Sequence, residues 1–321
     1  MRLPALGRWA LGVWLVLQTG QALSTTLLFL ADREISPFEA ALREPRQAPA
    51  TPITFTSPDS GITLRGFLAA DRSQSLRAVG SPTSLADFCG RQRLDGVVAW
   101  GDEAARVAVR ACRLPTLMVG MSRQQVAPLL ADVGRPSVSA IYLEAEPALN
   151  LRLARTLLPA ARTVGVLVPT PAPAWLAPLR TEARRLEFTL DEIVATDDLG
   201  AVRALRPRLA GLDAVLLPPD STLINEWSLK PLLLMTVRQS VPTLGGLTAR
   251  YVDAGVTAAV VADEARLPEQ MQTVLADWSR GRAPPPAYPT AVRVAVNPTV
   301  AHTLGLAAEA VERARSLFSR P

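Results

Sequence analysis

The sequence contains few of the residues on which catalytic and metal sites usually depend. It has one histidine, His302, and two cysteines among 321 residues. It also lacks a nucleophile elbow, a Walker glycine-lysine loop, a dinucleotide-binding glycine fingerprint and a His/Cys cluster with the spacing of metal ligands. We therefore expect no enzyme activity, no metal and no cofactor, and we expect His302 to be a surface or packing residue. Catalysis by carboxylates alone stays open as an alternative.

Lysine is equally scarce, because Lys230 is the only one and arginine supplies almost all of the positive charge behind the net +5. The arginines are scattered among Asp and Glu and are not gathered with interleaved aromatic residues, so we expect no nucleic-acid partner. A length of 321 residues and an apolar content of 49% predict two domains of ordinary size. We expect the protein to be a monomer.

Long apolar runs are absent after the first 24 residues. That segment places Arg2 and Arg8 before an uncharged apolar run at residues 9–17, with small residues around Ala22. This order predicts a cleaved signal peptide at residues 1–24 and export to a periplasm. An uncleaved membrane anchor is the alternative, although the run is about half of the roughly 20 residues that a spanning helix needs. With no cysteine near the cleavage point, we expect no lipid anchor.

Strand-like and helix-like segments alternate along the rest of the chain, which predicts an α/β fold with buried parallel strands. Residues 57–83 are expected to be loop, with one possible strand at 64–69. The expected strands cover residues 25–31, 53–56, 96–100, 116–119, 164–168, 191–195, 214–217, 256–262 and 292–296, with one more that ends at 243–246. The expected helices cover residues 37–42, 85–91, 103–112, 147–158, 174–186, 199–209, 224–239 and 264–280.

An internal repeat suggests two similar lobes. Residues 94–102 align without a gap with residues 212–220, and Leu-Pro-Thr-Leu at 114–117 matches Val-Pro-Thr-Leu at 241–244. Each copy ends in an aspartate just after a buried strand, Asp102 or Asp220. Because ligands bind at the carboxyl ends of parallel strands, two facing lobes would form a cleft for a small molecule. The alternative is that each aspartate caps a helix, although Ser221 or Thr222 could cap in place of Asp220.

The C-terminal part of the chain resembles the ABC transporter substrate-binding family that includes tryptophan and tyrosine binders. The resemblance is good from about residue 158 to 306, fair at 95–118 and poor at 32–83. It is carried by DAVLLPPDST at 213–222, VPTLG at 241–245, AGVTA at 254–258, LADWSRG at 275–281 and VNPTVAHTLGL at 296–306.

This resemblance implies a type I periplasmic-binding-protein fold, with two doubly wound parallel-sheet lobes joined by a hinge. Lobe 1 would comprise residues 25–139 and 255–285, and lobe 2 residues 140–254 and 286–321. A small organic ligand would bind in the interlobe cleft and be delivered to an inner-membrane ABC permease. The alternatives are a periplasmic protein that presents ligand occupancy to a membrane kinase or receptor and, more distantly, a degenerate hydrolase or glycosyltransferase that uses Asp220.

The resemblance also suggests site residues, since Asp220 and Ser221 match the family's cleft-facing aspartate and hydroxyl, and Gly101 matches a glycine of lobe 1. Asp102 departs from the pattern, because family members usually have a Thr or Ser there that suits a ligand carboxylate. The family's Asp-Gly segment is replaced at residues 42–45. A cationic, amine-bearing or uncharged ligand therefore rivals an amino acid. The candidate ligand-binding residues are Asp32, Gly101, Asp102, Tyr142, Thr170, Asp220, Ser221, Gly245 and Gly246.

The two cysteines offer a structural prediction. Cys89 and Cys112 lie near the carboxyl ends of successive expected helices, in a chain that we expect to be exported to an oxidising compartment. If those helices are neighbours on one face of a sheet, the two residues form a disulfide. Two buried free thiols are the alternative.

Overall fold

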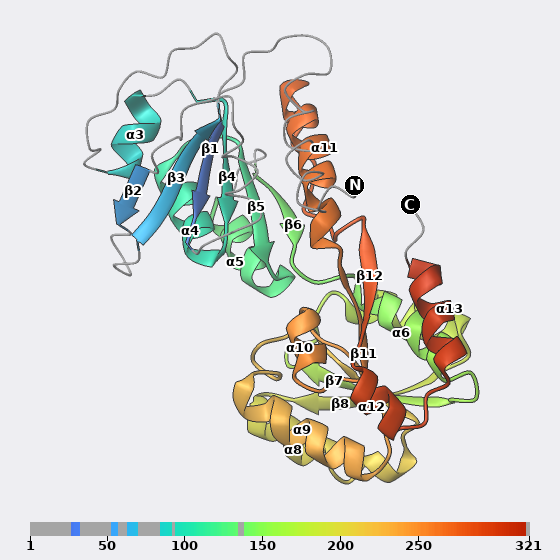
Figure 1. Ribbon diagram of the computed structural model, residues 1–321. Helices are drawn as coiled ribbons and strands as arrows, with labels where there is room; N and C mark the ends of the chain where they lie inside the picture. Colours follow the sequence, from blue (N-terminus) through green and yellow to red (C-terminus); the bar gives the residue numbers. More distant parts are fainter. Residues whose placement is uncertain are drawn as a thin grey trace. The chain divides into compact units, whose positions relative to one another are not determined.

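The computed structural model describes residues 27–32, 53–56, 63–69, 84–91, 94–133 and 138–318 (Figure 1). The chain forms two compact units, of which unit 1 contains the described segments up to Tyr142 together with Glu264–Ala287. Unit 2 contains Leu143–Asp263 and the chain from Tyr288 onward. The expected signal peptide, the helix expected at 37–42 and the replaced segment at 42–45 lie outside the described residues.

Unit 1 is built on a six-stranded sheet of order β2-β3-β1-β4-β5-β6. β1, β4, β5 and β6 pair in parallel. On the other side of β1, β3 pairs antiparallel with β1, and β2 pairs antiparallel with β3. The possible strand near residue 64 is present as β3. The bounds are β1 Leu27–Ala31, β2 Ile53–Thr56, β3 Thr63–Ala69, β4 Gly96–Trp100, β5 Thr116–Met121 and β6 Val138–Tyr142.

The helices of unit 1 pack against this sheet and one another. α11 packs on one face, where Met271 and Val274 join a core with Phe29 and Val98. α4 contacts β1, β4 and β5. Every residue of β1 is buried, and because successive side chains point to opposite faces of the sheet, both faces are covered at this strand. The helices are α3 Leu85–Arg91, α4 Asp102–Ala111, α5 Arg123–Val133 and α11 Leu267–Ser279, the last preceded by a 3₁₀ turn at Glu264–Arg266.

Unit 2 contains a second six-stranded sheet, of order β12-β11-β10-β9-β7-β8. Its strands are parallel except β12, which pairs antiparallel with β11. The bounds are β7 Thr163–Pro169, β8 Thr189–Ala195, β9 Ala214–Leu217, β10 Thr243–Gly245, β11 Ala258–Ala262 and β12 Val292–Val296.

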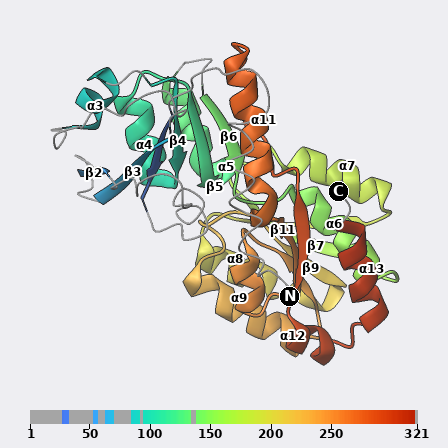
Figure 2. The same ribbon diagram turned by 45° about the horizontal axis from the view of Figure 1, so that its top comes forward.

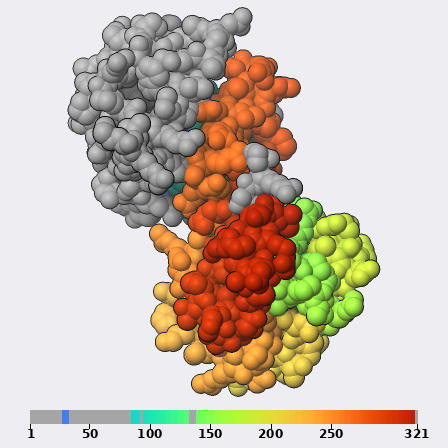
Figure 3. Space-filling model, turned by 45° about the vertical axis from the view of Figure 1, so that its right-hand side comes forward, coloured from blue at the N-terminus to red at the C-terminus, as the bar shows by residue number. Residues whose placement is uncertain are grey.

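Helices cover both faces of the second sheet (Figure 2). α6, α7 and α13 share one apolar core with the sheet, while α8, α9 and α10 share the other. Figure 3 shows the C-terminal segment that contains α12 and α13 as the red part of the surface of unit 2. The unit is therefore doubly wound, as expected. The helices are α6 Pro147–Leu157, α7 Leu176–Arg185, α8 Asp198–Leu205, α9 Glu226–Arg238, α10 Ala249–Asp253, α12 Pro298–Thr303 and α13 Ala308–Phe318, with a 3₁₀ turn at Leu209–Gly211.

The aligned repeat makes the same backbone contact in both units. The Val97 amide donates to the Pro115 carbonyl at 2.8 Å in unit 1, and the Val215 amide donates to the Pro242 carbonyl at 2.9 Å in unit 2. These residues occupy matching positions in the two copies of the repeat. The boundary between the units differs from the expectation that residues 255–285 belong to lobe 1. β11 pairs with β10 and β12, so the chain enters unit 1 again only at Glu264.

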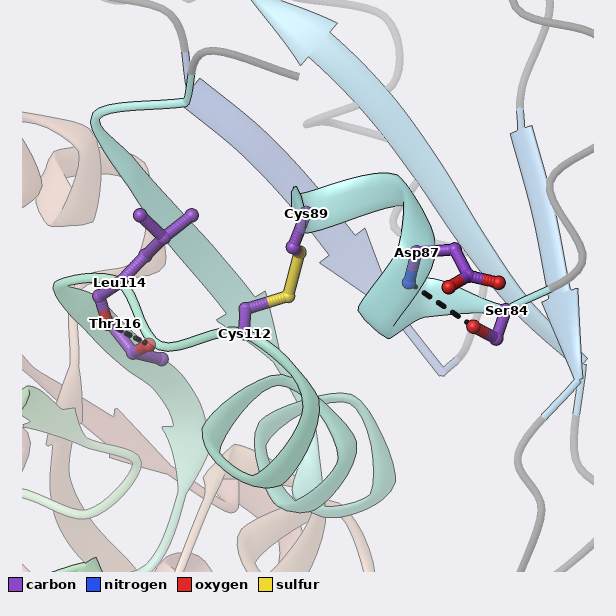
Figure 4. Close-up of a disulfide and its surroundings, with 6 residues drawn as sticks. All are labelled: Ser84, Asp87, Cys89, Cys112, Leu114 and Thr116. Atoms are coloured by element: carbon purple, nitrogen blue, oxygen red, sulfur yellow. Dashed lines mark hydrogen bonds between the residues drawn. A yellow bond between two sulfur atoms is a disulfide. The ribbon is translucent and has the colours of Figure 1, made fainter. Parts of the chain in front are cut away.

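The disulfide between Cys89 and Cys112 is present (Figure 4). It joins α3 to the residue that ends α4, with the two Cα atoms 5.6 Å apart. The two helices contact one another, which is the arrangement that the disulfide prediction required.

Candidate functional site

The strand order of each sheet defines a point at which a ligand can enter. β1 has β3 on one side and β4 on the other, and β7 lies between β8 and β9 in the same way. The loops that leave the carboxyl ends of β7 and β9 therefore diverge, and such a switch point is where open α/β sheets bind ligands. Thr170 directly follows β7, and Asp220 lies three residues after β9. In unit 1, Asp32 and Gly101 directly follow β1 and β4.

In unit 1, Asp32 and Gly101 are in direct contact. Gly101 has φ 97°, and a Cβ atom there would lie 2.1 Å from Oδ1 of Asp32. The other carboxylate oxygen of Asp32 accepts the Glu103 amide at 3.0 Å, which satisfies one of the free amides in the first turn of α4. A side chain at position 101 would displace this carboxylate, so Gly101 is required by the approach of Asp32 as well as by its backbone angle.

The structure corrects the interpretation of Asp102 as a helix cap. α4 begins at Asp102, and Gly101 occupies the capping position without a side-chain hydrogen bond. The Asp102 carboxylate instead binds Arg106 one turn further on. The carboxylate that accepts an amide of the first turn of this helix thus belongs to Asp32, a residue 70 positions before Asp102 in the chain.

Tyr142 ends β6 at the same edge of the unit 1 sheet. Its ring is buried, and its amide donates to the carbonyl of Ala287 at 2.9 Å. The guanidinium carbon of Arg123 lies 5.9 Å from the centre of the Tyr142 ring, within the range of a cation–π interaction. Sequence reasoning missed Arg123, although its position two residues after β5 was a usable signal.

In unit 2, Asp220 lies in the loop between β9 and α9 and is only 6% exposed. Its Oδ1 accepts the amide of Thr222 at 2.8 Å and the hydroxyl of the same residue. Those are its hydrogen-bond partners within the described chain, and neither is a cation. The alternative in which Asp220 caps a helix is wrong for α9, since Asn225 caps that helix in a reciprocal capping box with Ser228.

Two glycines and a tyrosine complete this edge of unit 2. Gly245 and Gly246 have φ values of 89° and 102°. A Cβ atom at Gly246 would lie 2.9 Å from the ring of Tyr251, so the glycine permits that ring to lie against the backbone. The Tyr251 hydroxyl donates to the carbonyl of Ile224 at 3.0 Å. Burial, followed by the charge of Asp220, raises the pKa of Tyr251, which therefore stays protonated as a hydrogen-bond donor.

The candidate residues thus fall into one group in each unit. Asp32, Gly101 and Asp102 lie together in unit 1, and Tyr142 lies at the same edge of the sheet but on β6, which β5 separates from β4. Asp220, Gly245 and Gly246 lie together in unit 2, where Thr170 and Ser221 are exposed. Sequence reasoning missed Tyr251, because its link to Asp220 depends on α10 folding back over the loop.

The electrostatic character of the unit 2 group is set by Asp220. A carboxylate that is almost fully buried normally has a cationic partner, since transfer of a charge from water is unfavourable. Within the described residues, no group of three or more His, Cys, Asp or Glu side chains could hold a metal ion. No described helix combines the length and apolar character needed to cross a membrane.

No family model matches the chain, and no curated protein is significantly similar to it. Solved structures do match, and three of them have 18% sequence identity to this chain. A conserved domain protein from Vibrio cholerae has a TM-score of 0.52, with 71% of this chain and 80% of that chain covered. An ABC domain in complex with L-Trp from Streptococcus pneumoniae also has a TM-score of 0.52, with 71% and 83% covered. A ligand-free, open substrate-binding protein with adhesive properties from Clostridium difficile has a TM-score of 0.55, with 69% and 77% covered.

These matches show that the chain has the type I periplasmic-binding-protein fold that the sequence resemblance implied. Identities of 18% concern the fold alone, and they do not confirm the narrower likeness to tryptophan and tyrosine binders.

Proposed function

We propose that the chain is the periplasmic solute-binding component of an ABC-type uptake system, and that Asp220 binds a cationic or amine-bearing group of a small organic ligand. The proposal rests on the Asp220 carboxylate, which is buried at the switch point of the unit 2 sheet. Within the described chain, its hydrogen-bond donors are the amide and the hydroxyl of Thr222. A ligand cation there would supply the charge partner that this carboxylate needs.

The unit 1 edge supports the same class of ligand. In many α/β proteins a helix amino terminus receives an anionic group of the ligand. Here the Asp32 carboxylate already accepts an amide of the first turn of α4. A ligand carboxylate would meet that negative charge, so an amine without a neighbouring carboxylate fits this edge better than an amino acid does. The bound ligand would be passed to an inner-membrane permease.

The test is a thermal-shift screen of primary amines, guanidines, polyamines, amino acids and neutral sugars, followed by titration of the compound that binds. A ligand present at 100 times its dissociation constant stabilises the folded protein by about 2.7 kcal/mol. The Asp220→Asn variant should bind an amine-bearing ligand at least about tenfold more weakly, because a hydrogen bond to a charged group is worth about 1.5–3 kcal/mol.

Asp213→Asn is the matched control, because Asp213 lies at the opposite end of β9 and accepts the amides of Arg162 and Thr163 at 2.7 and 2.8 Å. This control should lose some stability and keep its affinity. If Asp220→Asn binds the ligand as tightly as the wild type, Asp220 is not a ligand contact. If only neutral sugars bind, the proposed ligand class is wrong.

A further inference from the structure

The outward ridge of α9 is apolar where a surface helix is normally polar. Trp227 is 75% exposed, and Leu234, seven residues and about two turns further on, is 51% exposed. The opposite side of the helix is the buried one and carries Ser228, Leu232 and Thr236. Packing in unit 2 therefore does not account for the Trp227 and Leu234 side chains.

α8 repeats this arrangement beside α9. Leu199 is 59% exposed, and Arg203, one turn further on, is exposed as well. The two helices belong to the core on one face of the sheet and contact one another, so their outward ridges are neighbours (Figures 1 and 2). Their amino-terminal ends are joined by the Asn225 side chain, which donates to the Asp198 carboxylate at 3.1 Å. We define the α8–α9 face as Leu199, Arg203, Trp227, Lys230, Leu234 and Arg238.

Three basic residues flank the apolar residues of this face, while the carboxylates of Asp197, Asp198 and Glu226 lie at the amino-terminal ends of the two helices. Arg203, Lys230 and Arg238 are exposed and make no ion pair within the described chain, and Glu226 is the exposed carboxylate of α9. Some arginines elsewhere in unit 2 are paired, as Arg180 is with Glu192, whereas others, such as Arg313, have no ion pair among the described residues. The helix dipole favours Arg203 and Arg238 in their last turns, but it does not account for Lys230 in the middle of α9.

We propose that the α8–α9 face docks on an anionic lipid surface. Tryptophan and leucine on one side of a helix, flanked by lysine and arginine, is the composition that binds at the boundary between headgroups and acyl chains. The three unpaired cations complement anionic headgroups. A second copy of the chain is a poor occupant, because symmetric pairing of this face would bring like charges together.

Such docking goes beyond ligand binding, and it would hold the protein at the membrane in which the proposed permease resides. Each basic residue near an anionic surface increases partitioning to the membrane only about fivefold. A peripheral contact made by two helices with three such residues is therefore reversible.

The proposal is tested by co-sedimentation of the full chain with vesicles of phosphatidylcholine alone and of phosphatidylcholine with phosphatidylglycerol. We expect binding to the anionic vesicles that weakens as salt is raised. Trp227→Ala should lower the partition coefficient by about tenfold, through lost apolar burial. Lys230→Glu should lower it by at least about fivefold.

Matched controls come from α13. Leu317 is 51% exposed, the same fraction as Leu234, and Arg313 is exposed without an ion pair in the described chain. Leu317→Ala and Arg313→Glu should bind vesicles as the wild type does. They share its residues 1–24, so any binding by that segment cancels in the comparison. Circular dichroism melts should show that every variant is folded, because all four side chains are exposed.

The proposal is overturned if the wild type does not sediment with anionic vesicles, which is also the outcome expected if the face binds an acidic protein surface. It is equally overturned if Trp227→Ala and Lys230→Glu bind as tightly as the wild type, or if the α13 variants lose binding to the same extent. These outcomes are independent of the ligand screen, so docking can fail while the proposed uptake function stands.

Discussion

Glu182 is a buried acid on α7 whose ion pairs connect two helices. Its carboxylate receives Arg152 of α6 at 2.6 Å and Arg185 of its own helix at 2.7 Å. The hydrogen bond from Arg185, followed by that from Arg152, holds the pKa of Glu182 at about 2, against an opposing effect of burial. Both arginines are about half exposed, so water screens part of the attraction.

We expect Glu182 to stabilise unit 2 above pH 4.5 and to lose that contribution as the pH falls toward 2. The sign follows because the pKa of Glu182 is about 2 in the folded state, below its ordinary value of 4.5, so the unfolded chain takes up the proton first. After screening, the contribution is about 1–2 kcal/mol. Urea unfolding at pH 7 and pH 3 measures it.

Glu182→Gln should reduce this fall in stability between pH 7 and pH 3. Glu309→Gln, at an exposed acid of α13 with no ion pair in the described chain, should leave the fall unchanged. A Glu182→Gln variant with the full pH dependence of the wild type would contradict the assignment.

At the scale of elements, the disulfide fixes α3 to the end of α4. Cys112 is almost completely buried, and the bond closes a loop with a sequence separation of 23 residues. In the chain-entropy model, a loop of that size is worth about 3 kcal/mol. We expect the double variant Cys89→Ser and Cys112→Ser to lose about that much free energy of unfolding, measured in urea without reductant.

Dithiothreitol should destabilise the wild type by a similar amount and leave the double variant unchanged, since the chain has no other cysteine. Equal stability of the wild type with and without reductant would show that the bond contributes nothing in solution.

Elements with local signals were predictable from the sequence. β4 and β9 are short, fully apolar runs between helices, and this pattern is typical of buried parallel strands. The start of α9 was misplaced at Ile224, because the apolar pattern begins before the Asn225 cap that defines the helix end. β6 was not predicted, since Val-Ser-Ala-Ile-Tyr is short and follows a proline-containing loop without a clear period.

The candidate site was predictable only in part, for a physical reason. Asp220 could be located, because the end of a buried strand is visible in the sequence. The capping of α4 by Asp32 and the contact between Tyr251 and Gly246 join separate elements. No local pattern encodes such contacts, because they depend on strand order and on the way α10 folds back.

At the scale of the whole molecule, unit 2 depends on the end of the chain. α13 contributes Ala310, Ala314 and Phe318 to the core that contains α6 and α7. Removal of residues 307–321 should cost roughly 5 kcal/mol or more, which is a large part of the stability of a typical domain. We expect limited proteolysis to cleave unit 2 of the truncated protein rapidly.

Unit 1 serves as the internal control for that experiment, because it contains no residue beyond Ala287. Its fragments should stay protected at the wild-type rate. Protection of both units after truncation would mean that α13 is dispensable for the second core.

The three passages of the chain between the units, at Tyr142, Asp263 and Ala287, have a consequence for biosynthesis. The ribosome must translate past Ser279 before α11 can cover Phe29 and its neighbours on β1. Neither core is complete while most of the polypeptide is still emerging from the exit tunnel. Delayed folding of this kind would favour the proposed export of the chain in an unfolded state, because its stable structure forms only when nearly all of it has been made.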